Sequence, residues 1–170
     1  AWLVVGFIIA FSTFFTSAWP EVHRWLNSYD HPSKTQHVEY RRATVQFSEI
    51  TVEVNVPLTS AGQRKGLAGR TALGSREGML FVFNQPGREP FWMKGMLIPL
   101  DFVWIANNQV VDITVNVPPP QPGQTELPIY RPEFQATSML EVAGGFTAEH
   151  RIQIGDMLSI DPAPQLLLEK

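Results

Sequence analysis

Alternating apolar and polar positions organise most of the chain after residue 42. In residues 50–56 an apolar side chain occupies every second position, which is typical of a strand with one buried face. Residues 78–83 are continuously apolar, and a run this short and rich in aromatic side chains predicts a core strand. Two further strands are predicted at 136–142 and 157–160.

The stretch 100–117 predicts a β-hairpin. Alternating hydrophobicity on both sides flanks Asn107 and Asn108, and asparagine tolerates the positive φ that a tight hairpin turn requires. Earlier in the chain, Ser60 and Gln63 have the three-residue spacing of a capping box, so a short helix is predicted to begin there.

These elements predict a mostly β (α+β) fold. We expect a single compact, partly open, β-barrel-like domain over residues 43–161, with one or two short helices. Residues 118–132 form a Pro-rich loop, and its length indicates either a functional loop or an unconstrained surface loop. Residues 162–170 are predicted to be a loose C-terminal tail.

An uncharged stretch precedes this domain. A helix over residues 1–19 would be long enough for a hydrocarbon core of about 30 Å, and Trp2 and Trp19 would lie at its two ends. This N-terminal hydrophobic helix predicts a membrane anchor, whereas the small residues 16–18 allow a cleaved signal segment. The polar residues 20–42 would then be a stalk or linker. We expect the domain on the extracytoplasmic side of the cell membrane, or secreted or periplasmic if the segment is cleaved.

Composition excludes several kinds of chemistry. The chain has no cysteine, so disulfides, cysteine-ligated metals and thiol catalysis are impossible. Its formal charge of −3 disfavours nucleic acid as a partner. His23, His31 and His37 are not spaced as metal ligands, and neither a phosphate-binding glycine loop nor a nucleophile elbow is present. We therefore predict no metal and no cofactor.

Charged residues among apolar runs mark a candidate binding site. Arg70 and Lys94 are predicted to grip an anionic or carbonyl group, with Asp101 orienting them and the side chains of Trp92 and Trp104 as walls. In the alternative structural interpretation, Asp101 caps a turn or pairs with one cation, and the aromatic rings fill the core.

Two other functions stay open at this point. Asp101 together with Glu77 or Glu141 provides the paired carboxyls of an envelope hydrolase. Trp25 and the loop 118–132 could instead dock a structural accessory onto a membrane protein assembly. We favour a non-catalytic binding module for a small anionic, peptide or glycan ligand, or another envelope component, with the membrane contacted through the N-terminal segment.

Several ordered blocks of sequence support one family. They are QRKGLAGR at 63–70, EGMLFVF at 77–83, FWMK at 91–94, LIPLD at 97–101, LEV at 140–142, GG at 144–145 and IGD at 154–156. In order and separation they resemble the uncharacterised envelope family called domain of unknown function 192. The resemblance implies a compact, mostly β single domain, often behind a signal or anchor in prokaryotes, with no agreed biochemical activity.

The chain departs from that family pattern after the lysine of the FWMK block. Gly95 and Met96 stand where the family pattern has an Asn or Asp followed by Thr. If that polar pair contributes to ligand binding in the family, its replacement removes the contribution in this chain.

Overall fold

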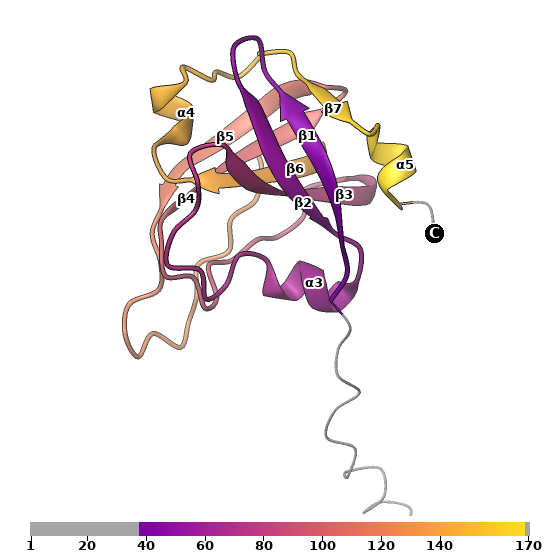
Figure 1. Cartoon of the computed structure of the whole chain (residues 1–170). Helices are drawn as coiled ribbons and strands as arrows, with labels where there is room; N and C mark the ends of the chain where they lie inside the picture. Colours follow the sequence, from indigo (N-terminus) through magenta and orange to yellow (C-terminus); the bar gives the residue numbers. More distant parts are fainter. Residues whose placement is uncertain (1–37, 169–170) are drawn as a thin grey trace, which may run out of the picture. The chain divides into compact units, whose positions relative to one another are not determined.

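The computed structural model describes residues 38–168, in which seven strands form one sheet in the order β5-β4-β6-β3-β2-β1-β7 (Figure 1). The strands are β1 (Tyr40–Gln46), β2 (Thr51–Pro57), β3 (Glu77–Gly87), β4 (Leu100–Ala106), β5 (Gln109–Val117), β6 (Ala136–Ala143) and β7 (Ser159–Asp161). The helices are α3 (Ser60–Lys65), α4 (Phe146–Glu149) and α5 (Pro164–Leu168). The predicted N-terminal hydrophobic helix and most of the stalk lie outside the described residues.

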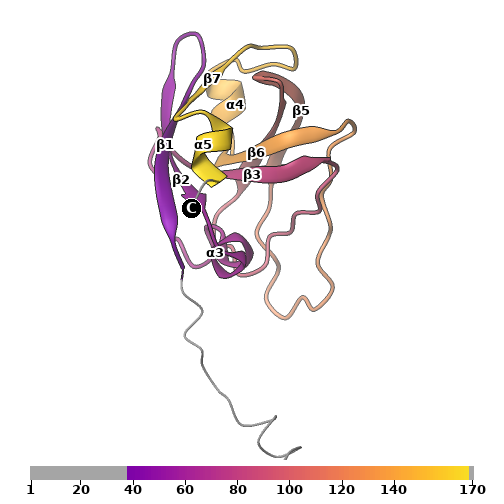
Figure 2. The same cartoon turned by 90° about the vertical axis from the view of Figure 1, so that its right-hand side faces the viewer.

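The sheet is curled into a half-barrel. Its neighbouring strands are antiparallel except for β2 and β3, which are parallel and joined through α3. Figure 2 shows the curl, with the β1–β2 hairpin upright while β3 and β6 run across the view. At the edges, a bridge between Gln109 and Met157 links the start of β5 to the segment before β7. The mostly β, partly open barrel predicted from the sequence is therefore confirmed.

Both faces of the central strands are buried. On one face the valines of β1 and β2 pack with Leu80, Leu140 and Phe146. On the other face lies an aromatic cluster in which Phe91 makes an edge contact with Trp104 at 5.4 Å between ring centroids. Tyr130 makes a similar contact with Phe102. Burial on two faces explains why β4 is almost continuously buried and why its sequence is apolar apart from Asp101.

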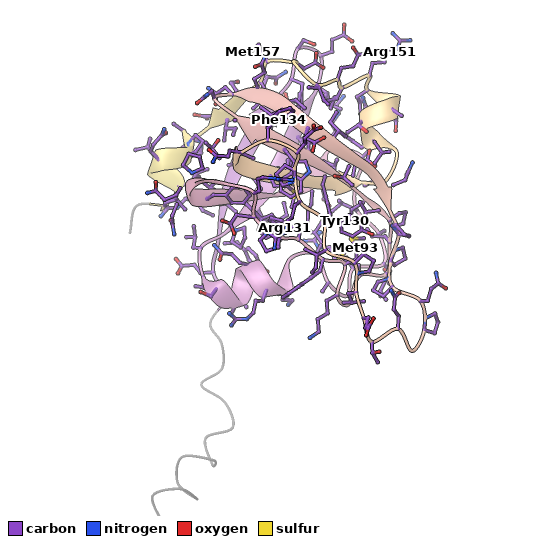
Figure 3. The ribbon with its side chains drawn as sticks, turned by 180° about the vertical axis from the view of Figure 1, so that it is seen from behind. Met93, Tyr130, Arg131, Phe134, Arg151 and Met157 are labelled. Carbon is purple, nitrogen blue, oxygen red and sulfur yellow. The ribbon has the colours of Figure 1, made fainter. Side chains whose placement is uncertain are left out.

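Two long loops cover the aromatic cluster. Met93, from the loop before β4, is buried in this cluster, and Tyr130 packs against it from the Pro-rich loop. In Figure 3 these two side chains lie close together, whereas Arg151 and Met157 lie at the opposite end of the domain. Reciprocal backbone hydrogen bonds between Phe91 and Tyr130 tie the two loops to each other. The Pro-rich loop therefore closes part of the core.

Two local predictions need correction. Residues 38–168 contain three helices and not one or two, because residues 164–168 of the predicted loose tail form α5 and bury Leu167 completely in the core. The N-cap of α3 is Thr59, whose Oγ1 accepts a hydrogen bond from the Gly62 amide at 3.1 Å, and not Ser60. In the part of the chain that the structure describes, no helix has the length and hydrophobicity that a membrane-spanning helix needs.

Candidate functional site

A pocket of about 580 Å³ lies beside α3. Its apolar wall includes Phe81, Phe91 and Trp92, and its cationic side chains are those of Arg64, Lys65 and Lys94. The volume falls in the range of pockets that bind small molecules. Among residues 38–168 no group of three or more side chains of the metal-binding kinds is placed to hold a metal ion. The pocket therefore combines an aromatic surface with positive charge.

The local sequence of α3 places two of these cations. Arg64 and Lys65 occupy the last turn of the helix, where the partial negative charge of the helix C-terminus favours basic side chains. Gly66 ends the helix with φ of 49°, a conformation that glycine adopts without steric cost. The turn at Gly66 lies close to Glu141. A side-chain Cβ atom at position 66 would be 3.7 Å from Glu141 Oε2.

Glu141 is the acidic residue buried in this pocket. Its register partners in the sheet are Met79 of β3 and Phe102 of β4, and cross-strand partners point to the same face. Glu141 is 5% exposed, and its Oε2 atom has no hydrogen-bond partner among the described residues. Burial raises the pKa of Glu141 to about 8, because the charged form loses its hydration. The carboxyl group is therefore mostly protonated at neutral pH.

Asp101 is a buried acid of a different kind. Its Oδ1 accepts hydrogen bonds from the backbone amides of Asn116 at 2.8 Å and Gly145 at 3.1 Å. Its Oδ2 accepts hydrogen bonds from the Thr147 amide at 2.9 Å and the Thr147 hydroxyl at 2.6 Å. Both oxygens are thus engaged in joining β4 to β5 and to the start of α4. This arrangement matches the structural interpretation of Asp101.

The two tryptophans occupy different environments. Trp104 is fully buried in the aromatic cluster, and its Nε1 donates a hydrogen bond to Thr114 Oγ1 at 3.2 Å. Trp92 is 44% exposed and lines the pocket together with Lys94, which is also exposed. Of the two indoles, only that of Trp92 can therefore meet a ligand in this pocket.

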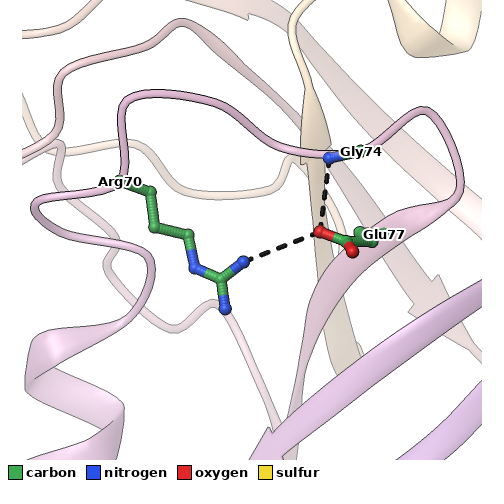
Figure 4. Close-up of polar contacts among 3 residues, drawn as sticks. All are labelled: Arg70, Gly74 and Glu77. Atoms are coloured by element: carbon green, nitrogen blue, oxygen red, sulfur yellow. Dashed lines mark hydrogen bonds and ion pairs between the residues drawn. The ribbon is translucent and has the colours of Figure 1, made fainter.

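Arg70 and Glu77 form a separate surface pair. Arg70 Nη1 lies 3.7 Å from Glu77 Oε2, which also accepts a hydrogen bond from the Gly74 amide at 3.3 Å (Figure 4). Both side chains line a second, more polar hollow of about 560 Å³ that includes Arg42 and Glu53. The side chains of Arg70 and Glu77 are about half exposed, so solvent screens their attraction.

Residues 42–160 match the family domain of unknown function 192, described as uncharacterized ACR. The chain belongs to this family. Among curated proteins, none is significantly similar to it.

Two solved structures are similar to this member of the domain of unknown function 192 family. A protein of unknown function from Novosphingobium aromaticivorans is 29% identical, with a TM-score of 0.62, and the match covers 76% of this chain and 91% of that one. A putative transcription regulator from Sinorhizobium meliloti is 21% identical, with a TM-score of 0.60, over 72% of this chain and 94% of the other. The second likeness concerns the fold alone.

Gly95 and Met96, which replace the polar pair of the domain of unknown function 192 pattern, have structural roles in this chain. Gly95 adopts φ of 72°, and its carbonyl accepts a hydrogen bond from the Gly69 amide at 2.9 Å. Met96 is buried in the aromatic cluster. A turn and a core contact therefore occupy the positions where the family pattern has two polar side chains.

The predicted meeting of Arg70, Lys94 and Asp101 in one hollow does not occur. Lys94 lines the first pocket, Arg70 lines the second, and Asp101 is buried among backbone amides. The structure instead brings Trp92, Lys94 and Glu141 together. Each of the seven predicted residues lies in the described part of the chain, but they are divided among four environments, the fourth being the aromatic cluster that buries Trp104.

The carboxyl pairs of the hydrolase alternative are also separated. Asp101 is paired with Val142 and Glu141 with Phe102, so the two acids point to opposite faces of the sheet. Glu77 is on the surface beside Arg70. Trp25, a predicted docking residue, lies outside the described residues.

Sequence reasoning missed Gln63, Arg64 and Lys65 as pocket residues. They were visible in the first family block, as a polar side chain and two cations immediately before a glycine. A helix C-terminus rich in basic residues was therefore the available indication, but nothing local showed that it faces β3 and β6.

Proposed function

We propose that the chain is a non-catalytic binding module that holds a small anionic ligand in the pocket beside α3. The observation that carries the proposal is the convergence of Arg64, Lys65 and Lys94 on one aromatic-walled pocket, in a protein with a formal charge of −3. Cations and aromatic walls suit different parts of one ligand: the cations bind its negative group, and Phe91 and Trp92 contact its apolar body.

The proposal selects among the ligand classes left open by the sequence. Three cations and one exposed acid, Glu89, line the pocket together with Glu141, which is mostly uncharged at neutral pH. The remaining charge therefore favours an anion over a cation. A carboxylate on an apolar or ring-shaped body, as in an acidic sugar or a small aromatic acid, suits both surfaces.

The location is part of the proposal. We place the module at the cell envelope, tethered or exported, because residues 1–19 are uncharged and of bilayer-spanning length. A reporter enzyme that is active only outside the cytoplasm, fused after residue 170, should be active. Activity only for a reporter that requires the cytoplasm would contradict this placement.

Substitution of Lys94 and Trp92 tests the binding site. We expect Lys94→Ala to weaken binding of phenylacetate by about tenfold, because it removes one charge-assisted contact. Trp92→Ala should weaken it comparably, by removing an exposed aromatic wall. Binding would be measured by calorimetry on residues 1–170 in a non-ionic detergent, with Tm expected to stay nearly constant because both side chains are exposed.

Arg70→Ala is the matched control. It also removes a cation, but from the second hollow, so phenylacetate affinity should be unchanged. Equal losses in Arg70→Ala and Lys94→Ala would indicate a general charge effect and contradict the proposed pocket. An unchanged affinity in Lys94→Ala would do the same.

A further inference from the structure

The chain buries two acids and treats them differently. Asp101 receives hydrogen bonds from two backbone amides on one oxygen and from Thr147 on the other. Glu141 is equally inaccessible but leaves Oε2 without a partner among the described residues. An unpaired buried polar group costs free energy that an apolar side chain at the same position would not cost. The stability of the fold therefore does not explain the carboxyl of Glu141.

The side chain of Glu141 lies on the buried side of the proposed binding pocket. Glu141 lines that pocket, and its Oε2 lies next to Gly66, at the end of the helix that carries Arg64 and Lys65. Its strand neighbours Met79 and Phe102 are apolar, so they cannot supply a hydrogen bond. The pocket is thus cationic at Arg64, Lys65 and Lys94 and offers an uncompensated carboxyl on its buried side.

The charge state of Glu141 decides what it can bind. At a pH below its pKa of about 8 the carboxyl is mostly neutral, and it offers one hydrogen-bond donor and a carbonyl acceptor. A hydroxyl or carbonyl oxygen of a ligand can hydrogen-bond to the neutral carboxyl. A second anionic group on the ligand would be repelled once the carboxyl ionises. The charged groups that share the pocket are Arg64 and Lys65 from α3 and Glu89 and Lys94 from the loop after β3. The packed strands β3 and β4 present apolar side chains, Met79, Phe81 and Phe102.

We propose that Glu141 is a specificity-determining residue, which hydrogen-bonds an uncharged oxygen at the inner end of a ligand whose anionic group is held by the cations of the pocket. The inference rests on the proposed anion-binding function and adds the ligand class. The preferred ligands are hydroxy- or oxo-substituted carboxylates with a ring or other apolar body between the two groups.

Matched aromatic acids test this inference. The probes are para-hydroxyphenylacetate and para-hydroxyphenylpropionate, each compared with the analogue that lacks the hydroxyl, on the chain of residues 1–170 in detergent. At pH 6.5 at least one hydroxylated probe should bind about tenfold more tightly than its analogue, as expected for one additional buried hydrogen bond. The two spacer lengths allow for different depths of the ligand.

Two variants separate the carboxyl from its surroundings. Glu141→Leu should abolish the preference for the hydroxyl, measured as the ratio of affinities within each pair of acids. Glu141→Gln retains a donor and an acceptor, so the preference should remain.

The outcomes distinguish the two proposals. A hydroxyl preference that persists in Glu141→Leu, or no preference in the parent chain, overturns the role of Glu141 while phenylacetate binding that depends on Lys94 still supports the anion pocket. Failure of all four acids to bind overturns the anion pocket and the inference together. Tm measured for each variant verifies that the protein compared is folded.

Discussion

Asp101→Asn is expected to lower the free energy of unfolding by roughly 3 kcal/mol and Tm by about 10 °C. The carboxylate accepts hydrogen bonds from three backbone amides and from the Thr147 hydroxyl. In asparagine an NH2 group replaces one of the two acceptor oxygens, so some of these donors would face another donor. The strands β4 and β5 and the turn before α4 would lose their shared acceptor. Thermal unfolding followed by circular dichroism measures the effect.

Asp161→Asn is the control for the loss of charge. Asp161 is exposed in β7, so the same substitution there should change the free energy of unfolding by less than about 0.5 kcal/mol. Thr147→Val should have an intermediate effect, because it removes one of the four hydrogen bonds. An Asp101→Asn protein with unchanged Tm but no phenylacetate binding would show that Asp101 contacts the ligand and is not a structural acceptor.

Raising the pH should destabilise the domain through Glu141. Its pKa is about 8 in the folded protein against an ordinary value of 4.5, so the folded state binds more protons than the unfolded state between these values. The stabilisation is therefore complete below about pH 4.5 and is lost as pH rises through about 8. Over this window the Glu141 contribution should fall by roughly 4 kcal/mol.

Glu141→Gln isolates this contribution from the other titrating groups. The variant has no ionisable group at position 141. The free energy of unfolding of the parent chain should therefore fall relative to that of the variant as pH rises. Denaturant unfolding at pH 5, 7 and 9 measures this difference. Parallel pH profiles for the parent chain and Glu141→Gln would contradict a buried carboxyl with a raised pKa.

The β-hairpin shows how much of the fold the sequence predicts. Asn107 and Asn108 adopt φ of 50° and 59°, as expected for the tight turn that joins β4 to β5. The core strand in 78–83 and the alternating strand in 50–56 also form. These features depend on the conformational preferences and spacing of residues that are neighbours in the chain, so a single sequence contains them. The missed helix α5 lacks such a pattern, because its burial depends on the distant sheet against which Leu167 packs.

By itself, the sequence determined the family, the β-rich class, most strands and the set of charged residues worth attention, since each follows from local periodicity or from ordered blocks. Only the tertiary structure decided which of those residues share a site. The sheet order places β6 between β3 and β4, which puts Glu141 between Met79 and Phe102 and on the opposite face from Asp101. Such pairings join strands that are separated by dozens of residues, and a change of register by one position would send Glu141 to the other core. Long-range packing therefore determines whether a buried acid has its hydrogen bonds satisfied by the fold, as Asp101 does, or keeps an oxygen without a partner among the described residues, as Glu141 does.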